Sequence, residues 1–312
     1  MNGILNVYKP KGLTSHDVVD EIRKKLNIRK VGHAGTLDPF AEGVLIIGLG
    51  HSTRLLEYFK DLKKRYYVKA ILGLITETFD ITGEVKEEKN CNKSAKEIIE
   101  AINSFKGKYL QVPPAYSAKK YKGERLYKLA REGKIISLPP REVEIYNIEN
   151  IKVNPPYFSF EVEVSTGTYI RSLCMDIGYK LSCGATAVEL VRTNIGDFNI
   201  KNSINPFEKS REEILSHLMN PVKVLNLPKV VIYKDYVEKI FNGIQPTLEF
   251  VKEIINDFKK GNDVMLVCDE KLIAIAKAER NSSFFETLRK ESRLRERIFS
   301  LKKVFKEAKF WK

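Results

Sequence analysis

Residues 32–43 have the sequence GHAGTLDPFAEG, and the apolar run Val44 to Leu49 follows at once. A short apolar run bounded by glycines is typical of a buried strand. The segment therefore predicts a Gly-rich loop that carries one acid, Asp38, directly before a strand. Pro39 favours an extended backbone at Asp38. Asp-Pro is also common in turns, so the loop alone leaves Asp38 open as a turn residue or an active-site acid.

Helices and strands are predicted on both sides of this loop. A capping pattern at Thr14-Ser15-His16-Asp17 begins a helix that continues to Leu26, and Ser94-Ala95-Lys96-Glu97 begins another that ends near Phe105. A third helix is expected over Ile170 to Leu181, and strands over 66–74, 141–153 and 157–164. The elements follow no regular β-α-β order, which favours an α+β fold with a mixed sheet.

A domain boundary is predicted between Asn205-Pro206 and Leu227-Pro228, which gives domains at 1–226 and 227–312. Beyond the boundary the pattern starts again with short strands near 230–233, 264–268, 272–277 and 304–305, and a helix at 235–241. The second domain is therefore expected to be small and β-rich.

The charge of the chain indicates an anionic polymer as partner. Its 54 Lys and Arg exceed its 40 Asp and Glu, for a formal charge of +14. Cations cluster at 9–30, at 119–134 together with Tyr116, Tyr121 and Tyr127, and at 286–312. Such patches attract phosphate backbones, and aromatic rings among them stack on bases. Solvated surfaces are the alternative interpretation of each cluster alone.

The sequence predicts neither a membrane segment nor a secretion signal. No apolar run approaches the ~20 residues of a membrane span, and residues 1–6 lack the basic and apolar regions of a signal peptide. No basic cluster lies on an amphipathic helix with a Trp and Phe face, which argues against membrane-surface binding. A cytoplasmic location is expected.

No pattern typical of a cofactor, metal or disulfide occurs. Neither G-x-x-x-x-G-K-[ST] nor G-x-G-x-x-G is present. Cys91, Cys174, Cys183 and Cys268 include no C-x-x-C pair, and the four histidines are scattered. We expect four buried, reduced cysteines, because a reducing cytosol disfavours disulfides.

A second candidate site lies at residues 165–171, where a strand is predicted to end and a helix to begin. Arg171 at such a junction can pair with a carboxylate, hold it ionised and orient it. A surface arginine at a helix start is the plainer alternative.

Many segments of the chain, in order, resemble the TruB family of pseudouridine synthases. The resemblance covers roughly residues 3 to 200. The matching segments are 9–12, 14–17, 32–39 with 43–45, 64–66, 72–73, 76–80, 113–119 with Gly123 and Tyr127, 130–131, 167–171 and 183–185. The C-terminal part resembles a PUA domain more loosely, and its loop at 281–297 is longer and more charged than expected. Val191 also departs from the family, in which a basic residue is common before Arg192.

The resemblance implies a pseudouridine synthase fold with a mixed, largely antiparallel central sheet. It implies isomerisation of uridine 55 in the T-loop of tRNA, without metal, redox cofactor or ATP. Asp38 is implied as the essential carboxylate, paired with Arg171, and Tyr66 as the tyrosine beside the base. Attack on C1′, attack on the uracil ring and removal of a sugar proton remain open as roles for Asp38.

The resemblance also implies that the uridine is flipped out of the loop. His33 is expected to fill the vacated space, with a structural hydrogen bond as its alternative role, and Tyr169 to pack nearby. The other implied substrate-binding residues are Leu190, Lys9, Lys119 and Arg131. Residues 119–141 are expected to form a basic lid on the T-stem-loop, and the basic tail to contact the acceptor stem. We expect a monomer with no obligatory protein partner.

Three rival functions remain at this stage. A non-catalytic RNA-binding protein explains the charge but not the joint match of an acid, an arginine and a tyrosine. A glycosidase or base-excision glycosylase also attacks an anomeric carbon, and it releases free base. A metal-dependent nuclease is disfavoured, because the sequence has no evident carboxylate cluster.

Overall fold

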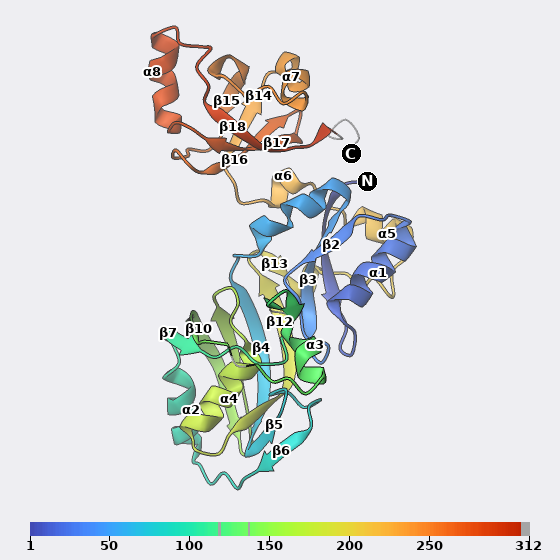
Figure 1. Ribbon diagram of the computed structural model, residues 1–312, viewed down its shortest axis with the longest axis vertical. Helices are drawn as coiled ribbons and strands as arrows, with labels where there is room; N and C mark the ends of the chain where they lie inside the picture. The colour runs from blue at the N-terminus through green and yellow to red at the C-terminus, as the bar shows by residue number, and fades with distance from the viewer. Residues whose placement is uncertain (118–119, 137, 307–312) are drawn as a thin grey trace. The chain divides into compact units, whose positions relative to one another are not determined.

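The computed structural model describes residues 1–117, 120–136 and 138–306 (Figure 1). The chain divides into two compact units. The larger unit holds 6–47 and 56–217, and the smaller holds 1–5, 48–55 and 218–312. The division after His217 lies nine residues before the expected boundary, and two N-terminal segments join the smaller unit. Domains at 1–226 and 227–312 stay a prediction.

A nine-stranded sheet runs through the larger unit, in the order β1-β3-β12-β4-β11-β10-β7, with β2 on β3 and β13 on β12. β12 is parallel to β3 and antiparallel to β4, and β4, β11, β10 and β7 continue antiparallel. The predicted α+β class with a mixed, largely antiparallel sheet is confirmed. The strands are β1 Gly3–Lys9, β2 Val31–Ala34, β3 Glu42–Leu49, β4 Lys64–Leu72, β7 Gly107–Gln111, β10 Arg141–Asn154, β11 Tyr157–Val164, β12 Ala185–Ile195 and β13 Phe198–Asn199.

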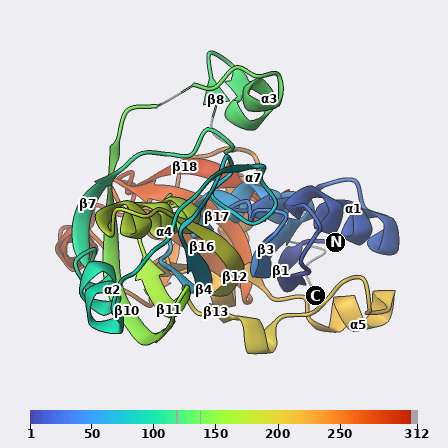
Figure 2. The same ribbon diagram turned by 90° about the horizontal axis from the view of Figure 1, so that it is seen from below.

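Helices α2 (Ala95–Asn103) and α4 (Ile170–Lys180) pack on the same side of this sheet (Figure 2). Their apolar residues join one core with alternate residues of β11, where Phe158, Phe160, Val162 and Val164 are buried as the sequence alternation predicts. The predicted capping boxes are present: Thr14 and Asp17 cap α1 (Ser15–Leu26), and Ser94 and Glu97 cap α2.

Several strands of the large sheet were not expected from the sequence, among them β1, β7 and β12, and β12 lies in the middle of the sheet. Register shifts at Ala187/Glu189 and Arg192/Asn194 break its alternation, which explains why the periodicity was hidden. The expected Gly-rich loop is also shorter than predicted, because residues 31–34 form β2 and pair with β3.

The smaller unit contains a five-stranded sheet in the order β15-β14-β16-β17-β18. The predicted β-rich C-terminal part is confirmed, with β15 as an additional strand. The strands are β14 Lys229–Ile232, β15 Val251–Ile254, β16 Asp263–Cys268, β17 Lys271–Ala278 and β18 Phe299–Val304. The helices are α6 Pro221–Val224, α7 Val237–Phe241 and α8 Phe285–Lys290, with 3₁₀ turns at Gly50–Phe59, Lys234–Tyr236, Leu248–Phe250 and Ser282–Phe284.

The remaining elements belong to the larger unit. They are β5 Leu74–Thr76, β6 Val85–Glu88, β8 Lys120–Tyr121, β9 Glu124–Arg125, α3 Leu126–Arg131, the 3₁₀ turn Ile200–Asn202 and α5 Arg211–Ser216. No helix in the described ranges is long and apolar enough to cross a membrane.

The expectation of four reduced cysteines was wrong. Cys91 and Cys183 form a disulfide with their Cα atoms 5.6 Å apart, although 92 positions separate them in the sequence. The fold brings them together because Gly73, after β4, exchanges backbone hydrogen bonds with Lys89 and Gly184. Local spacing carries no trace of such a long-range contact. Cys174 and Cys268 are buried and unpaired with another cysteine, as expected.

Candidate active site

The structure brings Asp38 and Arg171 together. Asp38 lies in the loop between β2 and β3, and Arg171 lies in the first turn of α4. Arg171 Nε donates to Asp38 Oδ2 at 2.8 Å. The arginine side chain is 4% exposed and the aspartate side chain 32% exposed. The carboxylate is therefore held from the protein side and remains accessible to a substrate from solvent.

The other hydrogen bonds of the Arg171 guanidinium go to three further acceptors of the protein. Nη1 donates to Thr78 O and to Asp80 Oδ2 at 3.1 Å, and Nη2 donates to Tyr116 O at 2.9 Å. With Asp38, these acceptors engage all three guanidinium nitrogens. The resulting network fixes the orientation of Arg171, and through it the position of the Asp38 carboxylate.

Asp80 also belongs to this network, and the sequence did not predict this role. Its side chain is 6% exposed and pairs with Arg171, while its other oxygen accepts from the backbone N–H and hydroxyl of Thr82. It occurs in the segment 76–80 that carried part of the family resemblance. That match was the available signal, but nothing local showed that Asp80 faces Arg171.

Arg192 is a second residue that the sequence did not predict as part of the site. Its side chain donates hydrogen bonds to backbone carbonyls at the two ends of the Asp38 loop. It is 2% exposed, and its guanidinium donates to Val44 O at 2.8 Å and to Gly35 O at 3.1 Å. Gly43 allows the close strand approach, since its φ is +116° and an added Cβ would lie 2.3 Å from Arg192 O. The loop is thus tied to β12 at both of its ends.

Lys9 lies beneath the same loop rather than at the surface. It is 0% exposed, and its Nζ donates to Leu13 O at 2.6 Å and to Pro39 O at 3.4 Å. Burial lowers the pKa of Lys9 to about 8, and the nearby Asp38 charge opposes that shift. This geometry supports a role in holding the loop, and its predicted contact with substrate stays a prediction.

Tyr66 and Leu190 lie on adjacent central strands. Tyr66 on β4 is opposite Arg192, and Leu190 on β12 is opposite Val68. Both side chains are buried, and they belong to the same apolar cluster as Leu37 of the Asp38 loop. The two predicted residues are thus grouped near the loop. His33 is half-buried on β2, one residue before that loop begins.

Tyr169 precedes the first turn of α4, and a buried glutamine holds its backbone. Tyr169 N donates to Gln111 Oε1 at 2.8 Å, and Gln111 Nε2 donates to Tyr169 O at 3.0 Å. Burial raises the pKa of Tyr169, and the Asp38 charge acts in the same direction, against Arg141 and Arg171. The charges of Asp38 and Arg171 therefore both affect the pKa of the Tyr169 hydroxyl.

The predicted basic lid is only partly described. Its backbone forms the β8–β9 hairpin and α3, in which Leu126, Leu129 and Ala130 are buried. Lys119 lies outside the described residues, as does the side chain of Arg131. Their predicted contacts with substrate stay predictions.

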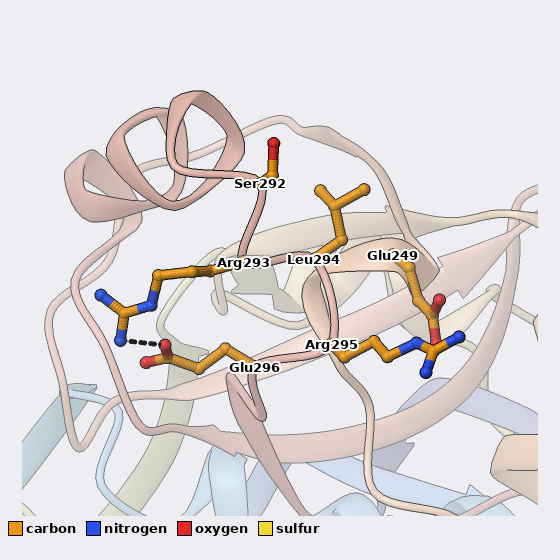
Figure 3. A pocket seen from close by; sticks show the side chains of 6 residues that line it. All are labelled: Glu249, Ser292, Arg293, Leu294, Arg295 and Glu296. Carbon is orange, nitrogen blue, oxygen red and sulfur yellow. Dashed lines mark hydrogen bonds and ion pairs between the residues drawn. The ribbon is translucent and has the colours of Figure 1, made fainter.

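A surface hollow in the smaller unit contains none of these residues. Its lining, shown in Figure 3, comprises Glu249, Ser292, Arg293, Leu294, Arg295 and Glu296. Arg293 there pairs with Glu296 of the same loop. Within 1–117, 120–136 and 138–306, no group of three His, Cys, Asp or Glu is arranged to hold a metal ion.

Comparison with known proteins identifies the class. Residues 23–170 match the profile described as TruB family pseudouridylate synthase (N terminal domain). The chain is 69% identical over 307 residues to tRNA pseudouridine synthase B of Thermosipho melanesiensis, covering 98% of this chain and 100% of the relative. It is 62% identical over 306 residues to the enzyme of that name from Thermotoga maritima, covering 97% and 98%.

A solved structure has a related fold over nearly the whole chain. It is described as an H/ACA RNP bound to a substrate RNA containing 2'-deoxyuridine. The TM-score is 0.72 at 25% sequence identity, covering 99% of this chain and 87% of that one.

These similarities define a pseudouridine synthase, an isomerase that acts on RNA. The chain belongs to the TruB family, whose members convert uridine to pseudouridine in tRNA. The predicted family is confirmed.

Proposed function

We propose that the chain isomerises uridine 55 in the T-loop of tRNA, with Asp38 as the essential carboxylate and the target base flipped out. The observation that carries this proposal is the Asp38–Arg171 ion pair, in which a buried arginine holds a solvent-accessible carboxylate. The family resemblance at 32–39 and 167–171 supports the same two residues.

The reaction is balanced without a second substrate. The N1–C1′ bond breaks, the uracil rotates, and C5 bonds to C1′, after which the C5 proton is lost to water and N1 is protonated. Asp38 acts in its ionised form, either as a nucleophile at C1′ or the uracil ring or as the base for a sugar proton. Arg171 positions the carboxylate, because its guanidinium is itself held by Asp80 and two backbone carbonyls.

The aromatic residues near the pair suit an extruded base. Extrusion costs a few kcal/mol, which stacking and hydrogen bonds in the pocket offset. Tyr66 and Leu190 belong to the apolar cluster that includes Leu37 of the Asp38 loop, and Tyr169 directly precedes α4, which carries Arg171. The Tyr66 hydroxyl is proposed to help remove the C5 proton, and His33 to occupy the space that the uridine leaves.

The remaining contacts are proposed to come from the charged segments. The lid at 119–141 grips the T-stem-loop, and the C-terminal unit, as a PUA-like domain, contacts the acceptor stem through its basic tail. A monomer suffices, since both segments belong to one chain.

Tritium release tests the function directly. An unmodified tRNA transcript with tritium at C5 of its uridines is mixed with wild-type protein, Asp38→Asn, and the matched control Asp20→Asn, an exposed acid on α1. We expect about one equivalent of tritium per tRNA from wild type and control, and none from Asp38→Asn. Binding of tRNA by Asp38→Asn should stay within a few-fold of wild type.

A second transcript locates the target. Replacing uridine 55 with cytidine should abolish release, and unchanged release would exclude position 55. Free uracil among the products would instead indicate a glycosylase. Tight tRNA binding without tritium release from wild type would favour the non-catalytic RNA-binding alternative.

A further inference from the structure

Arg141 is a second arginine beside Tyr169, and it is the last residue of the proposed lid, to which no individual contact has been assigned so far. It is the first residue of β10 and pairs in register with Gln111, the residue that holds the Tyr169 backbone. Its Cζ lies over the Tyr169 ring, 5.6 Å from the ring centroid. Tyr169 directly precedes the first turn of α4, in which Arg171 holds Asp38, so Arg141 lies at the same end of α4 as the ion pair.

The Arg141 guanidinium lacks an acceptor. Its Nε and Nη2 atoms are buried, yet neither has a hydrogen-bond partner among the described residues. Burying part of a permanent cation without an acceptor is costly, and the cost is removed when an anion pairs with it. The side chain as a whole is half-buried, so a small movement of it would bring these nitrogens to a ligand that arrives from solvent.

Gly167 makes the space that this guanidinium occupies. An added Cβ at Gly167 would lie 1.9 Å from Arg141 Nη2, and the Gly167 φ of +79° also disfavours other residues. The positive φ at the junction between β11 and α4 favours glycine, and the Arg141 guanidinium fills the space left beside it.

We propose that Arg141 binds a backbone phosphate of the RNA, adjacent to the uridine that Asp38 engages. A buried permanent cation without a protein acceptor needs a full negative charge, which a phosphodiester supplies and a uracil carbonyl does not. The planar fork of arginine also matches two phosphate oxygens. The proposal rests on the proposed function, because it places the target nucleotide at Asp38.

A cycle of protein and RNA changes tests the contact. The RNA is a T-arm hairpin carrying uridine 55, with a neutral methylphosphonate in place of either phosphate flanking that uridine. The proteins are wild type, Arg141→Gln, Arg141→Lys, and the matched control Lys152→Gln, an exposed cation on the same strand. Affinity is measured over a range of KCl concentrations, together with single-turnover tritium release and thermal stability.

We expect Arg141→Gln to weaken hairpin binding about tenfold and to reduce the salt slope by about 0.7 to 0.9. One neutral linkage should weaken wild type to a similar extent and have little further effect on Arg141→Gln. Arg141→Lys keeps the charge without the fork, so its affinity should be intermediate and its salt slope near that of wild type. The control should bind like wild type.

Two results would overturn the proposal. Equal losses for both proteins at each neutral linkage would show that Arg141 contacts neither phosphate. A lower melting temperature of Arg141→Gln with an unchanged salt slope would make Arg141 a stacking partner of Tyr169 alone. If Arg141→Gln does not fold, Arg141→Lys against the neutral linkages decides in the same way. Failure of the proposed function is distinct, since wild type would then release no tritium while the binding cycle still reports on Arg141.

Discussion

Arg141 lies over the Tyr169 ring and Arg171 follows Tyr169 by two residues in the chain, and the surroundings of the two arginines differ in one respect. The guanidinium of Arg171 has protein acceptors on all three nitrogens, two of them carboxylates. The guanidinium of Arg141 has two buried nitrogens and no acceptor among the described residues. An arginine whose acceptors are all supplied by the protein fixes geometry, whereas one that lacks them is available to a charged ligand.

Replacing Arg171 should give the largest effect, because Arg171 is the arginine whose three guanidinium nitrogens all have protein acceptors. Arg171→Leu leaves Asp80 buried without its cation, which costs about 3–5 kcal/mol of unfolding free energy. Tritium release should fall to background, measured beside a denaturant titration. Arg171→Lys keeps the charge but not the fork, and should recover part of the stability. Wild-type turnover by either variant would contradict the assigned role.

Asp80→Asn should weaken the same network but leave some of its hydrogen bonds in place. The amide retains the shape and can keep the bond to Thr82, but one of the two carboxylates on Arg171 is lost. We expect about 1–3 kcal/mol of destabilisation and a single-turnover rate reduced about 10- to 100-fold by analogy with outer-shell groups. Binding of tRNA should be nearly unchanged. A loss confined to binding would place Asp80 outside the network that orients Asp38.

Gln111→Leu tests the residue that pairs in register with Arg141 and hydrogen-bonds the backbone of Tyr169, two residues before Arg171. The change leaves the Tyr169 N–H without its acceptor, while the Tyr169 C=O keeps the bond from Leu173 N, at a cost of about 1–3 kcal/mol. As a positioning residue, Gln111 should affect the single-turnover rate more than the tRNA dissociation constant. Gln111→Glu retains one acceptor and should recover part of the rate. Equal losses in rate and binding for both variants would argue against positioning.

Two buried lysines, unlike the arginines, should make the unfolding free energy depend on pH. Burial lowers the pKa of Lys9 to about 8 and that of Lys64 to about 8, below the ordinary 10.5. Between pH 8 and 10.5 the unfolded chain therefore binds more protons at these groups. Their contribution makes the unfolding free energy rise with pH, by at most about 1.4 kcal/mol per pH unit for each. Denaturant titrations at pH 7.5 and 9.5 should show a smaller rise for Lys64→Met than for wild type.

Lid charges should give the smallest effect, because each is expected to add no more than one phosphate contact. Lys119→Glu with Arg131→Glu should weaken tRNA binding several-fold and lower the salt slope. The single-turnover rate at saturating tRNA should change little. An unaltered affinity and salt slope would remove the lid from the binding surface.

Much of the fold followed from local patterns. The alternation of residues 157–164 and the capping boxes at Thr14 and Ser94 each depend on neighbours within one element, and the structure has them. The fold class, the β-rich C-terminal part and the family were also predicted correctly. Strands β1, β7 and β12 were missed, and for β12 two register shifts hide the periodicity.

The site was predictable only in part, for a related reason. Asp38 and Arg171 could be named through the family resemblance, although 133 positions separate them. Asp80, Arg192 and Gln111 act through tertiary contacts that no local spacing encodes. The disulfide between Cys91 and Cys183 is the same kind of contact, and there the local argument led to the wrong expectation.

The division of the chain into units has a consequence for how this protein can be cut, fused or inherited. The path passes from one unit to the other after residues 5, 47, 55 and 217. Ile4 is fully buried and exchanges both of its backbone hydrogen bonds with Met219. Deleting everything beyond His217 would therefore expose an apolar strand end at the N-terminus. The smaller unit contains residues 1–5 and 48–55 as well as the C-terminal segment, so residues 218–312 alone are not the whole unit. Gene fusions or exchanges at this junction should therefore carry residues 1–5 and 48–55 along with it.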